Sequence, residues 1–168
     1  MSLESAIDLD RREDVVGASQ AYEESLGKEE GSHVALLNLL VLYWQATDFG
    51  FSSKRGLSPE FVTHASRRLR VLLAGNAAYR LDPGFVFWSK YIAWADLGES
   101  LSVEECRRLL RADPKQLDPA MFIFTSSHGR ECSNEAMELL DRTAKDKTAR
   151  ARYIESVLRS TIQVYASK

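Results

Sequence analysis

Residues 34–47 read VALLNLLVLYWQAT, a run whose polar side chains are Asn38, Gln45 and the final Thr47. Asn38 and Gln45 fall on one narrow stripe of a helical wheel, and the rest of the wheel is apolar. The run is shorter than a membrane span, which takes about 20 apolar residues. A helix that is apolar almost all round must be covered on several sides. The stretch therefore predicts an inner helix of an all-α protein.

Residues 85–98 read FVFWSKYIAWADLG and repeat this pattern at an offset of 51 positions. Ser89 and Asp96 take the places of Asn38 and Gln45 on the polar stripe. Self-similarity of this kind indicates a repeated structural unit. The two stretches predict a pair of inner helices in a stack.

Helical periodicity continues outward from both stretches, and we find no alternating strand pattern. Amphipathic helices over 59–81 and 103–112 are expected to cover the inner pair, each leading to an Asp-Pro stop. Ser58, Ser102 and Ser133 begin motifs typical of helix starts. The breakers that separate the helices lie at 27–32, 50–58, 82–84, 98–102, 113–114, 126–129 and 145–148. The pattern predicts seven or eight helices in antiparallel pairs, with a capping helix over Thr148–Ala166.

The 168 residues fit a single domain over 1–168. The apolar share of 45% and the charged share of 27% are those of an ordinary globular protein. A net charge of −2 gives no argument for nucleic acid or for an anionic membrane. Two cysteines suit a reducing compartment, and no targeting segment is visible, so the expected location is the cytoplasm.

Catalytic patterns are scarce, and we expect no catalytic residue, metal site or cofactor. His128 and Cys132 have the spacing of half a metal site, but they flank Gly129 in an expected loop and have no second pair. Cys106 lies on the apolar side of its helix and is expected to be a core thiol. An enzyme would have to use His64, His128 or Glu131. No glycine-rich phosphate loop is present.

Charge is distributed unevenly along the chain. Residues 1–31 hold nine acids and three bases, whereas residues 141–168 hold seven bases and three acids. Basic clusters also occur at Arg67-Arg68-Arg70 and Arg107-Arg108-Arg111. Solvated helix faces explain such runs, and so does an acidic end that steers a cationic protein partner. The acidic residues that we single out for partner binding are Glu23, Glu24, Glu29 and Glu30.

Two further features are candidates for partner binding. Asp48, Phe49 and Phe51 follow Tyr43-Trp44, either as a loop folded over the core or as an exposed anchor. The polar stripes of the inner helices are expected to line the concave surface that repeat scaffolds use for binding. Those stripe residues are Asn38, Gln45, Ser89 and Asp96.

Residues 12–18, followed by Tyr22, Ser25 and Leu26, resemble the second half of a tetratricopeptide repeat. Leu81-Asp82-Pro83 and Ala112-Asp113-Pro114 are similar to the closing turn of that repeat. The 34-residue spacing of the family is absent, and residues 50–57 are an insertion foreign to it. The resemblance implies a short solenoid of paired helices, a scaffold that hosts many protein partners.

Residues 43–51 and 87–92 resemble those of small bacterial immunity proteins, which bind and occlude a cognate toxin. The resemblance assigns no binding residue. We therefore expect a non-catalytic protein-interaction module, and an immunity protein is its most concrete form. An adaptor or chaperone that binds a peptide segment is the alternative, and an enzyme or a nucleic-acid binder has less support.

Overall fold

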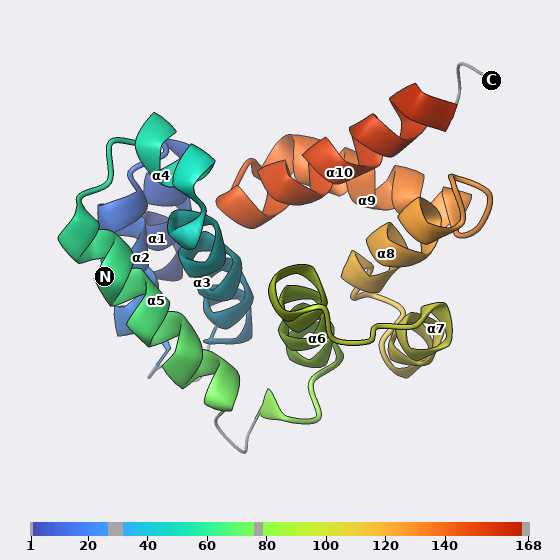
Figure 1. The fold of residues 1–168 in the computed structure, drawn as a ribbon, viewed down its shortest axis with the longest axis horizontal. Helices are drawn as coiled ribbons and strands as arrows, with labels where there is room; N and C mark the ends of the chain where they lie inside the picture. The colour runs from blue at the N-terminus through green and yellow to red at the C-terminus, as the bar shows by residue number, and fades with distance from the viewer. Residues whose placement is uncertain (1, 27–31, 76–78, 166–168) are drawn as a thin grey trace. The chain divides into compact units, whose positions relative to one another are not determined.

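The computed structural model describes residues 2–26, 32–75 and 79–165. Ten helices and no strand are found in these ranges, which confirms the all-α class and exceeds the seven or eight helices predicted (Figure 1). None of these helices has the length and the apolar character that a membrane crossing requires. The helices are α1 (Leu3–Arg11), α2 (Val15–Ser25), α3 (Ser32–Thr47), α4 (Phe49–Lys54), α5 (Pro59–Ala74), α6 (Pro83–Leu97), α7 (Val103–Ala112), α8 (Asp118–Ser126), α9 (Ser133–Asp146) and α10 (Ala149–Tyr165).

Two of the helices lie where the sequence signals are misleading. The chain turns between α1 and α2 at Glu13, which adopts a left-handed φ of 66° although neither glycine nor proline is present. Asp14 then caps α2 by accepting the Gly17 N–H at 2.9 Å. The segment 50–58, interpreted as a breaker, holds most of α4.

The predicted helix ends are right at some positions and wrong at others. α7 occupies the expected residues and ends before Asp113-Pro114. α5 begins at Pro59 under the Ser58 cap, as predicted, but it ends at Ala74 instead of continuing to Leu81. Asp82 therefore caps the start of α6, where its Oδ1 accepts the Phe85 N–H at 2.8 Å. An Asp-Pro pair can begin a helix as readily as it ends one, because proline is favoured at the first helical position.

The chain divides into two compact units. Unit 1 comprises residues 1–80 together with 148–150, and unit 2 comprises residues 81–147 and 151–168. The single domain expected from the chain length stays a prediction.

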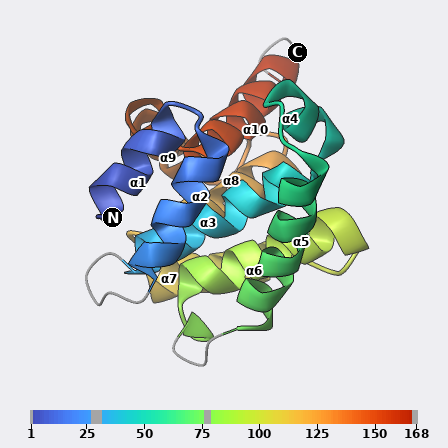
Figure 2. The ribbon, with the colours of Figure 1, turned by 90° about the vertical axis from the view of Figure 1, so that its left-hand side faces the viewer.

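In unit 1, α3 packs against α2, α4 and α5, and α1 packs against α2 (Figure 2). Every residue of α3 from Ala35 to Tyr43 is buried. This confirms that the most apolar stretch of the sequence is an inner helix covered on several sides.

A chain of buried hydrogen bonds crosses the core of unit 1. Asp10, only 1% exposed, accepts the Tyr22 hydroxyl at 3.0 Å and the Ala149 N–H at 2.7 Å. Tyr22 also accepts a hydrogen bond from the Asn38 amide at 3.1 Å, and the Asn38 oxygen accepts from Arg150 Nε at 2.9 Å. Ala149 is the first residue of α10, so Asp10 supplies both an acceptor and a negative charge to a helix N-terminus.

Unit 2 is built around the aromatic side chains of α6. Trp88 is fully buried, and its indole N–H donates to Asp118 Oδ2 at 2.7 Å. Its ring lies 5.3 Å from Phe87, 5.5 Å from Tyr91 and 6.1 Å from Tyr153, measured between centroids. The aromatic residues that sequence analysis left open between core and binding surface are therefore core residues in the first part of α6.

The predicted capping box at the start of α7 is present. The Ser102 hydroxyl accepts the Glu105 N–H at 3.1 Å, and Glu105 Oε2 accepts the Ser102 N–H at 2.9 Å. Glu105 also forms an ion pair with Lys90 of α6. The Lys90 hydrogen bond, followed by the two from Ser102, lowers the pKa of Glu105 to about 2.

We expect this lowered pKa to make unit 2 sensitive to acid. Between pH 4.5 and about 2, the unfolded chain protonates Glu105 while the folded chain does not, so stability falls as the pH falls through this range. The Glu105→Gln variant should show a flatter profile of unfolding free energy there, measured by denaturant titration. Lys90→Met should flatten the same part of the profile, because it removes the largest cause of the shift. A Glu105→Gln profile as steep as that of the wild type would contradict this assignment.

Candidate functional site

The acidic residues proposed for partner binding have different environments. Glu23 is half-buried, and it accepts two hydrogen bonds from Arg68, at 2.8 and 2.7 Å, and one from the Tyr43 hydroxyl at 3.1 Å. Burial and the Glu23 carboxylate together raise the pKa of Tyr43. Glu24 is exposed on α2, whereas Glu29 and Glu30 lie outside the described residues. Glu23 therefore links α2, α3 and α5, and of the two acids that the structure describes Glu24 is the one on the surface.

The aromatic segment after α3 is helical and has one exposed ring. Asp48 Oδ1 accepts the Phe51 N–H at 2.8 Å and so caps α4. Phe51 is half-buried, and the guanidinium of Arg55 lies 5.6 Å from its ring centroid. Phe49 is 85% exposed. Of the two phenylalanines, Phe49 is therefore the exposed one, and the prediction that either binds a partner stays a prediction.

The two polar-stripe residues on α3, Asn38 and Gln45, form hydrogen bonds within unit 1. Asn38 is 1% exposed and bonded on both sides within the buried network. Gln45 is half-buried and donates to the Ala149 carbonyl at 3.4 Å. On α6, the Ser89 hydroxyl is buried and has no hydrogen-bond partner within the described ranges, whereas Asp96 is exposed.

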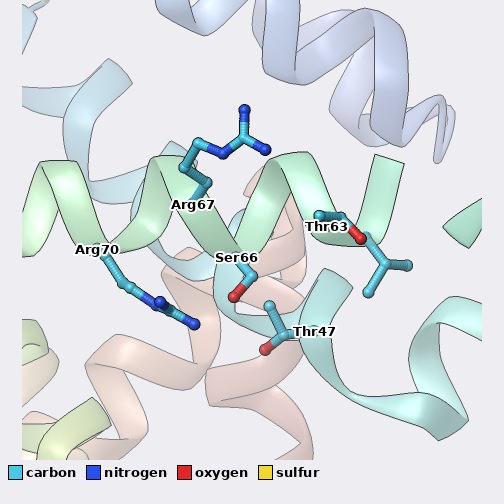
Figure 3. A pocket seen from close by; sticks show the side chains of 6 residues that line it. Thr47, Thr63, Ser66, Arg67 and Arg70 are labelled. Atoms are coloured by element: carbon cyan, nitrogen blue, oxygen red, sulfur yellow. The ribbon is translucent and has the colours of Figure 1, made fainter. Parts of the chain in front are cut away.

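A pocket of about 400 Å³ lies beside the start of α4, between the end of α3 and the face of α5. Figure 3 shows Arg70 extending on the same side of α5 as the hydroxyls of Ser66 and Thr47, while Arg67 extends away on the other side. The residues that line the pocket are Thr47, Val62, Thr63, Ser66, Arg67 and Arg70. Sequence analysis noted the arginine cluster of α5 but did not predict a pocket.

The arginines of this cluster do not share one role. Arg68 is committed to Glu23 in a two-point ion pair. Arg67 and Arg70 are exposed, and neither forms an ion pair or a hydrogen bond with any residue that the structure describes. The arginine cluster in the sequence therefore did not reveal which arginine is paired, because Glu23, the partner of Arg68, lies 45 positions away in the chain.

The residues that an enzyme would have to use do not all belong to one unit. His64 lies on α5 in unit 1, where its ring centroid is 6.1 Å from that of Tyr43. His128 stacks on Tyr165 at 4.6 Å, and Glu131 is ion-paired with Arg107, both in unit 2. No group of three metal-ligating side chains occurs among the residues with described positions.

Both cysteines are free thiols. Cys106 is buried, as predicted, and burial raises the pKa of its thiol to about 12. Burial also raises the pKa of Cys132. Since the thiolate is the nucleophile, a raised pKa makes both thiols less reactive near neutral pH.

Comparison with known proteins gives no identification: no protein family, no curated protein and no solved structure matches this chain.

Proposed function

We propose that the chain is a non-catalytic protein-interaction module, and that its concrete role is that of a bacterial immunity protein which binds and neutralises a cognate toxin in the cytoplasm. The observation that carries the proposal is the 85% exposed side chain of Phe49. Its backbone is already ordered by the Asp48 cap and by α4, so binding would fix little additional chain. Aromatic side chains on ordered backbone are typical anchors of protein interfaces.

The helix pairing supports the finer architecture that we propose, a short solenoid of tetratricopeptide-like pairs. Within each unit, neighbouring helices pack together: α1 with α2 and α3 with α5 in unit 1, and α7 with α8 in unit 2. The inner helices α3 and α6 also begin at Ser32 and Pro83, which keeps the 51-residue offset of the sequence pattern. Such scaffolds commonly serve protein binding.

Replacing Phe49 by serine should weaken partner binding about 30-fold or more and leave stability within about 0.5 kcal/mol, because the ring is exposed in the free protein. The measurement is a pull-down with tagged protein from cells that naturally express it, followed by affinity measurement with the recovered partner. Leu97→Ser is the matched control, since Leu97 is also an exposed apolar side chain, 73% exposed, but lies on α6.

If the chain is an immunity protein, its partner must be a toxin. The recovered protein should be toxic when expressed alone, harmless with the wild-type chain, and toxic again with the Phe49→Ser variant. A Glu24→Lys variant tests whether the partner is cationic, because reversing a surface charge should slow association and reduce its dependence on salt. Many substoichiometric partners would favour an adaptor or chaperone. Equal loss of binding in Phe49→Ser and Leu97→Ser, or no partner at all, would refute the proposal.

A further inference from the structure

The pocket beside α4 is lined by two arginines whose N–H donors have no acceptor among the described residues. Arg67 and Arg70 line it, and they have no ionic partner among the described residues. In the same helix, Arg68 differs from them because it donates two hydrogen bonds to the Glu23 carboxylate. The five N–H donors of the Arg70 guanidinium therefore have no acceptor among the described residues on the pocket side of α5, and Arg67 adds a second such guanidinium on the other side of the helix.

The hydroxyl groups of the pocket differ in what they can donate. Thr47 already donates to the Trp44 carbonyl at 2.7 Å, and Thr63 donates to the Pro59 carbonyl at 2.9 Å. Ser66 has no hydrogen-bond partner in the described part of the chain. It stands four residues before Arg70, so both side chains project from one face of α5. Ser66 and Arg70 form a pair of free donors directed to one place (Figure 3).

None of the described residues that line the pocket is acidic. The two acids nearest to it in sequence are Asp48 and Glu60, and both carboxylates are occupied at helix starts. Asp48 caps α4, and hydrogen bonds from the Glu60 backbone and from Ser58 lower the pKa of Glu60. No described acid therefore neutralises the positive charge of the arginines at the pocket, which favours an anionic ligand.

The size and lining of the pocket indicate which kind of anion it could bind. Its volume of about 400 Å³ lies in the usual range for small-ligand sites and exceeds the need of a bare oxyanion. Val62 supplies an apolar side chain to the lining beside the charged ones. A phosphate group carries about −1.5 to −2 charges near neutral pH, and arginine clusters are its common recognition site in proteins.

We propose that the pocket binds a phosphate monoester, with Arg70 and Ser66 donating to the phosphate oxygens, Arg67 adding charge at the rim, and Val62 contacting the organic part. Phe49 does not line this pocket. A phosphorylated side chain and a small phosphorylated metabolite present the same chemistry to it.

Calorimetric titration of the full chain at constant ionic strength tests the site. The probes are inorganic phosphate, O-phospho-L-serine, a hexapeptide containing phosphoserine, and the same hexapeptide without phosphate. We expect saturable binding of the phosphate-bearing probes, tighter for the two esters than for inorganic phosphate, and none of the plain peptide. A phosphopeptide that binds more tightly than phosphoserine identifies a protein as the source of the ligand, and equal affinities identify a small molecule.

Matched variants separate this pocket from general surface charge. Arg70→Gln should weaken phosphoserine binding at least about tenfold, and Ser66→Ala about two- to tenfold. Arg12→Gln removes an exposed arginine outside the pocket and should have no effect. Thr63→Val should also have little effect, because that hydroxyl already donates to the Pro59 carbonyl. Circular dichroism confirms that each variant is folded.

Two results would overturn the proposal: no saturable binding of any phosphate-bearing probe, or equal weakening by Arg12→Gln and Arg70→Gln. The titration needs no protein partner, so its failure leaves the Phe49 experiment intact, and failure of the Phe49 experiment leaves the titration intact.

Discussion

Replacing Asp10 by alanine is expected to lower the free energy of unfolding by about 3–5 kcal/mol, because the change orphans two buried donors and leaves a cavity. The orphaned groups are the Tyr22 hydroxyl and the Ala149 N–H, now held at 3.0 and 2.7 Å. The first turn of α10 also loses the negative charge beside its N-terminus. Denaturant unfolding followed by far-ultraviolet circular dichroism measures the difference.

Two comparisons show whether the loss comes from this network. Asp8→Ala removes an exposed acid of the same helix whose nearest ion pair, to Arg11, spans 3.6 Å, so it should cost at most about 1 kcal/mol. The double variant Asp10→Ala with Tyr22→Phe should lose less than the sum of the single variants, because the second change removes the hydroxyl that the first one orphans. Equal losses for Asp8→Ala and Asp10→Ala would contradict the assigned role of the network.

Replacing Trp88 by alanine should destabilise the protein by about 3–5 kcal/mol through the cavity it leaves in unit 2. The ring is fully buried and touches Phe87, Tyr91 and Tyr153. Trp88→Phe keeps most of the aromatic packing but removes the N–H that donates to buried Asp118, so it should cost about 1–3 kcal/mol. The measurement is again denaturant unfolding.

Trp94 provides the control for this second prediction. It lies on the same helix and contacts Tyr91 and Phe122, but it is 41% exposed. Trp94→Ala should therefore cost clearly less than Trp88→Ala. If the two alanine variants lost the same stability, burial would not be the cause of the Trp88 effect.

The sequence predicts those features of the fold that depend on neighbouring residues. The apolar character of α3, the capping box of Ser102 and the end of α7 at Ala112 all follow from local patterns, and the structure confirms them. The predicted start at Ser133 is right, but its cap is Cys132 in a left-handed conformation, without a side-chain hydrogen bond. Local patterns fail where a residue such as Glu13 turns the chain with a conformation that its type rarely adopts.

The candidate site was less predictable because it depends on partners distant in sequence. In the sequence, the three arginines Arg67, Arg68 and Arg70 cannot be told apart by role. Only the packing of α5 shows that Arg68 is neutralised by Glu23, 45 positions away, whereas Arg70 has no such partner among the described residues. In the same way, Asn38 reads as a surface stripe on a wheel, although the fold surrounds it with Tyr22 and Arg150.

The hydrogen bond between Asp10 and Ala149 also has a consequence for biosynthesis. The two residues are 139 positions apart, and a ribosome adding about 5–20 residues per second supplies Ala149 on the order of ten seconds after Asp10. During that interval the Asp10 carboxylate can accept the Tyr22 hydroxyl but still lacks the Ala149 N–H. The buried hydrogen-bond network of unit 1 can therefore be completed only after most of the C-terminal half of the polypeptide has been translated.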